Sequence, residues 1–260
     1  DSGSKRMSEI ELLYGHGDGK DIAVSKIPLN LEDTSEITLK GAHIFYVLYE
    51  IKMSAAESIL PPSLHPSIPA LFSLTFIRGN NSSIGDFTLA YTGIACRTGI
   101  KPRHLVMKAF CDNPQASSIL EQRYGFSICP AKVTCKESYD QVHGKIETKD
   151  VVIVDMSIGN CIPLVGAGGI IKYSPTLNGC LINDVPTLVQ FEANYDFKNV
   201  IRGEPAEKIF NSKSLGHEAM TTKYPIAGTY AAVDIHLMPP RFQVSLDKPA
   251  EEGGAKKITP

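Results

Sequence analysis

The chain lacks several features that would assign it to a large class of proteins. Its 260 residues contain no tryptophan, which excludes a binding surface built on Trp anchors. Lys plus Arg number 26 and Asp plus Glu number 28, so there is no basic excess of the kind that nucleic-acid binding requires. No apolar run approaches the roughly 18 residues that cross a bilayer. We therefore expect a globular protein without nucleic-acid or membrane partners.

Motifs for metal binding and for common hydrolytic chemistry are also missing. The six cysteines include no Cys-x-x-Cys pair, and the seven histidines show neither His-x-His nor His-Glu-x-x-His spacing. No Gly-x-Ser-x-Gly elbow occurs. We expect free thiols in a reducing compartment, no metal and no cofactor. No signal-peptide core follows Met7, so a cytoplasmic location is expected.

The pattern along the chain is mainly β. Met7-Ser8-Glu9 is typical of a natural start, so residues 1–6 are interpreted as an added extension, 7–248 as one domain and 249–260 as a flexible tail. Two helices are expected, one opened by a Ser54/Glu57 capping box and ended by Pro61-Pro62, the other over 114–124. A further helical turn is expected at 205–210. Strands are predicted at 41–52, 69–78, 86–97, 103–111, 127–136, 150–158, 187–200, 229–238 and 242–246. Many strands with few short helices favour a closed or nearly closed antiparallel barrel.

The segment from Leu60 to Cys135 resembles the acetoacetate decarboxylase-like superfamily. It contains Leu60-Pro61-Pro62 after a short helix, Gly85-Asp86-Phe87-Thr88-Leu89 on a strand, and Tyr124-Gly125-Phe126-Ser127-Ile128-Cys129-Pro130-Ala131-Lys132 after the second helix. The order of elements matches over about residues 41–240. The resemblance implies a mainly β (α+β) fold, a cone-like antiparallel β-barrel around an apolar cavity. It also implies an enzyme with a Schiff-base lysine that takes a small-molecule substrate and can form homo-oligomers.

The sequence departs from that family at its two chemical groups. Without gaps, Ala131 stands where the family has its Schiff-base lysine, and Lys132 falls on the next lysine. Leu89 stands where the family has its cavity carboxylate. Alternation along a strand gives Cys129, Ala131 and Val133 one apolar face and turns Lys132 to the other, which looks solvated.

Alternation also suggests a cavity wall and a set of polar groups. Phe87, Leu89 and Tyr91 share one strand face, and we expect them to line one substrate pocket together with Cys129, Ala131 and Val133. Tyr91 would donate a hydrogen bond to a carbonyl oxygen. His236, oriented by Asp234 on the same strand face, would transfer a proton.

Three functions remain open at this stage. The first is a cofactor-independent enzyme of natural-product metabolism, of the cyclase, isomerase or lyase type, that acts non-covalently on an apolar oxo compound. The second is a Schiff-base decarboxylase or aldolase-dehydratase that uses Lys132. The third is a ligand-binding barrel without catalysis.

Overall fold

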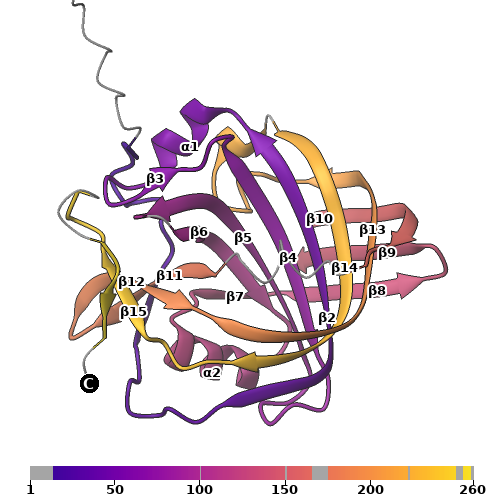
Figure 1. The fold of residues 1–260 in the computed structure, drawn as a ribbon, viewed down its shortest axis with the longest axis horizontal. Coiled ribbons are helices and arrows are strands. Elements are labelled where there is room, and N and C mark those ends of the chain that lie inside the picture. Colours follow the sequence, from indigo (N-terminus) through magenta and orange to yellow (C-terminus); the bar gives the residue numbers. More distant parts are fainter. Residues whose placement is uncertain are drawn as a thin grey trace, which may run out of the picture.

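One large sheet dominates the protein (Figure 1). The computed structural model describes residues 14–99, 101–149, 151–165, 175–221, 223–249 and 254–258. Within them, hydrogen bonds connect the strands in the order β16-β15-β12-β11-β6-β5-β4-β2-β14-β13-β10-β9-β8, and β1, β3 and β7 pair with β11, β5 and β6. The strands are β1 Val24–Pro28, β2 Ile37–Ile51, β3 His65–Pro66, β4 Leu71–Gly79, β5 Phe87–Thr98, β6 Lys101–Cys111, β7 Ile128–Pro130, β8 Lys132–Ser138, β9 Gln141–Thr148, β10 Val151–Pro163, β11 Thr176–Ile182, β12 Val185–Phe191, β13 Ala193–Phe210, β14 Lys223–Leu237, β15 Phe242–Ser245 and β16 Lys256–Lys257.

The sheet is mixed, and hydrogen bonds do not close it in the described part of the chain. β11 pairs in parallel with β6, as do β7 with β6 and β1 with β11, whereas the remaining pairs are antiparallel. The outermost strands of the order, β16 and β8, are not paired with each other. The mainly β class with few helices is therefore confirmed, but the expected closed antiparallel barrel is not.

The second helix forms as its sequence predicts. α2 spans Pro114–Tyr124, and the Asn113 side chain accepts hydrogen bonds from the backbone N–H groups of Gln115 and Ala116. Gly125 ends it with a φ of 71°, a left-handed conformation that favours glycine.

The first helix differs from its prediction at one end. α1 spans Met53–Ile59 and begins after Lys52, which provides no side-chain cap. Ser54 and Glu57 therefore lie inside the helix, and the predicted capping box is wrong. The helix does end before Pro61-Pro62. A short 3₁₀ helix, η1, spans Glu218–Thr221.

The other differences from the predicted elements arise where a strand is interrupted or pairs with a strand that the sequence did not indicate. The predicted strand over 127–136 is divided at Ala131, because β7 pairs with β6 and β8 pairs with β9. The strand over 187–200 is likewise divided at Glu192. Residues 205–210 continue β13 instead of forming a helical turn. Within the predicted tail, Lys256 and Lys257 pair with β15.

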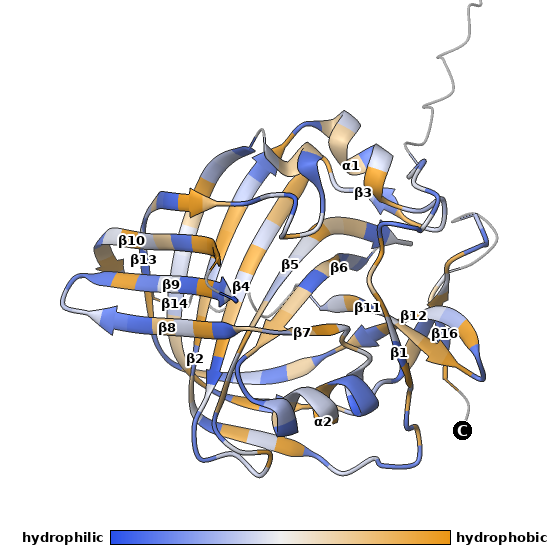
Figure 2. Ribbon diagram, turned by 180° about the vertical axis from the view of Figure 1, so that it is seen from behind, coloured by the Kyte–Doolittle hydropathy of each residue, from blue (hydrophilic) through white to orange (hydrophobic). Residues whose placement is uncertain are grey.

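The central strands bury a hydrophobic core on each of their two faces. On one face, which we call the hairpin-side face, Phe45, Val47 and Tyr49 of β2 pack with residues of β8, β9 and β10. On the other, the helix-side face, Ile44, Tyr46 and Leu48 pack with residues of α2. Neighbouring residues of a strand point to opposite faces, so β2 serves both cores. Figure 2 shows hydrophilic and hydrophobic residues interleaved along β8 and β9, which cover the hairpin-side face.

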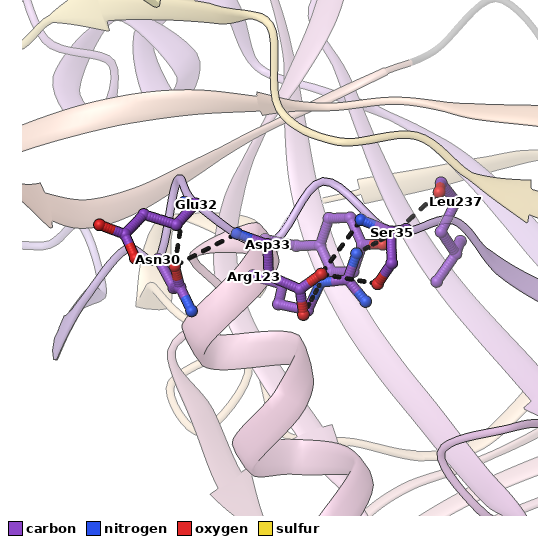
Figure 3. Close-up of polar contacts among 7 residues, drawn as sticks. Asn30, Glu32, Asp33, Ser35, Arg123 and Leu237 are labelled. Atoms are coloured by element: carbon purple, nitrogen blue, oxygen red, sulfur yellow. Dashed lines mark hydrogen bonds and ion pairs between the residues drawn. The ribbon is translucent and has the colours of Figure 1, made fainter. Parts of the chain in front are cut away.

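Two close contacts hold the covering elements in place. Gly144 of β9 lies so near the rings of Phe45 and Phe76 that a Cβ there would come within 2.8 Å of Phe76. On the opposite face, the segment before β2 is fastened to the end of α2, where Arg123 contacts Asp33 and the carbonyl of Ser35 (Figure 3). No helix among the described residues is long and apolar enough to span a membrane.

Candidate active site

A small cavity lies on the helix-side face, between the central strands and the start of β11. A water-sized sphere can move its centre within about 10 Å³, which is room for about one water molecule. Its described lining residues come from β2, β4, β5, β6, β11 and β13: Ile44, Tyr46, Ser73, Thr75, Ile77, Tyr91, His104, Thr176 and Tyr195.

Strand register brings the polar side chains together. Tyr46, Thr75 and Tyr91 lie opposite one another on the adjacent strands β2, β4 and β5. The next two strands of the sheet beyond β5 are β6 and β11, and there His104 of β6 lies opposite Thr176 of β11. Alternation in β4 turns the hydroxyls of Ser73 and Thr75 into the cavity while Phe72, Leu74 and Phe76 face the other core.

Gly93 makes the space between two of these groups. It lies opposite Ser73 in β4, and a Cβ added to it would be 3.1 Å from the Cβ of His104 and 3.5 Å from the Ser73 hydroxyl. A larger residue at this position would press on the Cβ of His104. The glycine therefore lets His104 and Ser73 face the same space.

His104 is the least expected member of the cavity. It is 6% exposed, and neither ring nitrogen has a hydrogen-bond partner in the described part of the chain. Burial lowers its pKa to about 4. The imidazole is therefore neutral at pH 7, with one nitrogen able to donate and the other able to accept a proton.

Two phenols of the cavity, Tyr91 and Tyr195, are held in their protonated form. Burial raises the pKa of Tyr91 to about 12, although a hydrogen bond with the Thr75 side chain opposes the shift. Burial and the neighbouring Tyr91 also raise the pKa of Tyr195. At neutral pH these groups are uncharged hydroxyl donors. None of the described lining residues carries a formal charge at pH 7.

The predicted cavity wall is divided between the two faces of the sheet. Tyr91 lines the cavity, and Phe87 and Leu89 share its core. Cys129, Ala131 and Val133 also share one face, as predicted, but they pack against the hairpin-side core. The expectation of a single pocket lined by both sets is therefore wrong, because alternation within a strand does not reveal which of the two cores its apolar face meets.

Lys132 lies away from the cavity. Its side chain is 74% exposed, and its Nζ is 3.7 Å from Glu147 Oε2. Together with Ala131 it lines an open hollow beside α2. The prediction that Lys132 points away from the interior is confirmed.

Asp234 and His236 do not reach Tyr91. Asp234 accepts a hydrogen bond from the backbone N–H of Gly41 and lies 3.6 Å from Lys198. His236 Nδ1 is 3.1 Å from the Thr38 hydroxyl and 3.5 Å from Glu36. Both side chains occupy the partly exposed positions of β14 that alternate with Val233 and Ile235, which pack in the helix-side core with Tyr91. The structure therefore does not bring the proposed pair to the cavity.

Sequence reasoning missed His104, Ser73, Thr75 and Thr176. A usable signal was present in β4, where Ser73 and Thr75 alternate with large apolar residues in a strand buried on both faces. Buried polar residues are rarer than exposed apolar ones and carry more information. The place of His104 depends on the parallel pairing of β6 with β11, which no local pattern reveals.

The fold and a small, hydroxyl-lined cavity characterise a β-rich protein. A family model described as acetoacetate decarboxylase matches residues 26–230, and the chain belongs to that family. A search of curated proteins found no match.

Solved structures of similar fold include an acetoacetate decarboxylase, an acetoacetate decarboxylase-like enzyme and an enzyme of enduracididine biosynthesis. The acetoacetate decarboxylase of Legionella pneumophila is 16% identical, with 92% of this chain and 96% of that chain covered and a TM-score of 0.68. An acetoacetate decarboxylase-like enzyme of Sphingomonas wittichii RW1 is 13% identical, with 88% and 96% covered and a TM-score of 0.66. The enduracididine biosynthesis enzyme MppR, complexed with pyruvate, is 13% identical, with 79% and 88% covered and a TM-score of 0.65. At these identities the likeness concerns the fold. Family membership makes the chain an enzyme of this superfamily.

Proposed function

We propose that the protein catalyses proton transfer on a small uncharged carbonyl compound, as a cofactor-independent isomerase, cyclase or lyase that forms no covalent intermediate. The observation that carries the proposal is the neutral imidazole of His104, which has no hydrogen-bond partner among the described residues and lies in a cavity lined by hydroxyl groups. Buried polar groups are usually paired, and exceptions concentrate where a ligand completes the pairing. We infer that the substrate supplies the missing partner.

The reaction can be written with these groups alone. The free imidazole nitrogen of His104 takes a proton from the carbon next to the substrate carbonyl, and the electrons of that C–H bond move to the carbonyl oxygen. The Tyr91 hydroxyl donates a hydrogen bond to this oxygen as its charge develops. In a β,γ-unsaturated ketone the enolate is conjugated, so His104 returns the proton to the γ-carbon, the double bond moves next to the carbonyl and the carbonyl re-forms, which completes an isomerisation. In a dicarbonyl compound the enolate carbon attacks the second carbonyl, and the alkoxide formed on ring closure takes the proton from His104.

The family's Schiff-base chemistry has little support in this chain. Ala131 supplies no amine at the position where the resemblance expects one, and the amine of Lys132 is in solvent. The described lining residues of the cavity include no lysine. A Schiff base needs an amine within reach of the bound carbonyl.

The lining also favours an uncharged substrate. A carboxylate moved into this cavity would lose its hydration without meeting a cation among the described lining residues. A ketone, enone or lactone makes no such demand, because its carbonyl oxygen needs only one or two donors.

Entry to the cavity requires movement, since the present space admits about one water molecule. Tyr195 is the one half-buried residue among the described lining residues, and the others are buried. We infer that Tyr195 is the gate and that its displacement admits the substrate.

Exchange of α-protons tests the proposal without knowledge of the natural substrate. The enzyme is incubated in D₂O with pentan-2-one or with its anionic counterpart 4-oxopentanoate, and deuterium incorporation is followed by NMR. We expect exchange of pentan-2-one that depends on His104 and is much slower for the anion. Exchange that His104→Gln leaves unchanged would refute the assigned role. A borohydride-trapped adduct on Lys132 would restore the Schiff-base alternative, and binding without exchange of any ketone would favour a ligand-binding protein.

A further inference from the structure

A second group of polar side chains lies on the hairpin-side face, directly behind the cavity. Arg78 of β4 is half-buried there, and its guanidinium donates to the Cys135 carbonyl of β8 at 3.0 Å and lies 3.1 Å from His43 Nδ1 of β2. Its Nε is buried without a hydrogen-bond partner among the described residues. The Nε–H of Arg78 is thus a buried donor that no described residue uses.

The charge of Arg78 is not balanced locally. No carboxylate of the described residues forms an ion pair with it, whereas Arg123 pairs with Asp33 and Arg241 with Glu192 (Figure 3 shows the first of these). A partly buried cation without an anion is costly, and proteins normally pair such groups. The arrangement is therefore suited to an anion from outside the chain.

Tyr230 supplies a second unused donor beside it. Tyr230 is 4% exposed, and its ring stacks on His43 with the centroids 5.5 Å apart. Its hydroxyl is buried and has no partner in the described part of the chain. Burial is the main cause that raises the pKa of this phenol, which therefore remains a donor at neutral pH.

His43 joins the two groups and is neutral. Register places it opposite Arg78 on β4, with Tyr230 diagonally across on β14. Burial and the adjacent guanidinium lower its pKa, although Glu137 opposes the shift. With Nδ1 accepting from Arg78, the neutral tautomer carries its proton on Nε2.

We propose that Arg78, Tyr230 and His43 form a binding site for a small carboxylate. The Arg78 Nε–H and the Tyr230 hydroxyl donate to its oxygens, and a guanidinium holds a carboxylate with better geometry than a lysine does. This site is distinct from the cavity. His43 and Arg78 adjoin Ile44 and Ile77, which line the cavity, but neighbours in a strand point to opposite faces. One small molecule cannot occupy both sites.

Glu137 is the internal competitor for this site. It is exposed on β8, and its charge acts on His43, Cys135 and Tyr230. A rotated Glu137 that reached Arg78 would take the place of the external anion. Replacement of Glu137 by glutamine removes this competing charge and is expected to tighten binding.

Titration with acetate at constant ionic strength, with chloride as the balancing anion, tests the proposal. Binding is followed by ¹H–¹⁵N shifts of the His43 imidazole and by calorimetry. We expect saturable binding, weakened about tenfold in Tyr230→Phe, because a hydrogen bond to a charged group is lost. Arg78→Gln should abolish it. Arg97→Gln, at an exposed position of β5, is the matched control and should bind as the wild type does.

Three results would overturn the proposal. They are an absence of saturable binding in the wild type, a Glu137→Gln variant that binds no more tightly than the wild type, and wild-type affinity in both Arg78→Gln and Tyr230→Phe. Because Tyr230→Phe preserves the ring and its stacking, it should remain folded even if Arg78→Gln does not. Thermal unfolding of each variant in chloride alone checks this.

Discussion

The two faces of the central sheet are formed by the same strands but differ in the charge of their polar side chains. On the helix-side face, β2 and β4 contribute Tyr46, Thr75 and other uncharged side chains to a cavity whose described lining carries no formal charge. On the hairpin-side face, alternate residues of these strands include Arg78, a cation that forms no ion pair with the residues that the structure describes. Alternation within a strand is enough to set the two environments back to back.

Two neutral histidines illustrate the difference. Burial alone lowers the pKa of His104. Burial and the positive charge of Arg78 together lower the pKa of His43. Neither nitrogen of the first imidazole has a partner within the described ranges, while the second imidazole already accepts from Arg78. We therefore assign proton transfer to His104 and anion binding to the group around His43.

The sharpest test of this contrast is the activity of His104→Gln. Loss of a general acid or base typically costs about 10²–10⁴ in rate, and we expect a loss in this range for ketone α-proton exchange. His143→Gln is the control, since His143 is partly exposed and pairs with Asp155 at 2.6 Å, away from the cavity. Equal activity in the two variants would break the assignment.

The same residue gives the protein a pH dependence of stability. The folded chain protonates His104 near pH 4, whereas the unfolded chain does so near pH 6.5, so unfolding takes up a proton between these values. The stabilisation is complete above pH 6.5 and is lost as the pH falls through 4. It amounts to about 3 kcal/mol.

Urea unfolding of the wild type and His104→Gln at pH 7 and pH 4.5 measures this contribution. We expect the wild type to lose about 2–3 kcal/mol more than the variant on acidification. His43 and the other titrating groups are present in both proteins, so their contributions cancel in the difference. An equal loss in both would show that His104 is not held neutral by burial.

Local sequence patterns predicted the helices, most strands and which residues share a strand face. They did not predict which strand faces pack against each other. Pro114 near the first turn and Gly125 just past the end predicted α2, because signals at helix ends act within one turn. Alternation grouped Phe87, Leu89 and Tyr91 correctly, and it turned Lys132 away from Cys129 and Val133. Which core each group joins depends on how β8 and β9 fold back over the sheet, a contact between distant segments that has no local signature. The cavity itself was therefore predicted only through Tyr91.

A smaller effect is expected at Tyr91. Tyr91→Phe keeps the ring, which packs 5.6 Å from Phe126, and removes the hydroxyl that would donate to the substrate oxygen. We expect a loss of about 10–10² in the rate of α-proton exchange, somewhat less than for a preorganised oxyanion donor because Tyr46 and Thr75 lie in the same row. Tyr124→Phe, in the same core but outside the lining, is the matched control. If both variants retain the full rate, the carbonyl is bound by another donor.

The smallest effect is expected at Lys132, where the family resemblance would place the largest. Its amine is in solvent, and its contact with Glu147 is an exposed pair of the kind that contributes little to stability. Lys132→Ala should therefore change the free energy of unfolding by less than about 0.5 kcal/mol. Lys136→Ala, also on β8 and exposed, is the control for a general change of surface charge.

Activity is the decisive measurement for Lys132. Without a Schiff base, Lys132→Ala should retain α-proton exchange within about tenfold, which is at most about 1.4 kcal/mol of transition-state stabilisation. A covalent mechanism that uses Lys132 would instead lose the reaction, because the variant has no amine at this position to form the Schiff base. A thousandfold loss in Lys132→Ala with normal activity in Lys136→Ala would move the chemistry from the cavity to the hollow beside α2. The contrast between the two faces would then no longer describe the catalytic site.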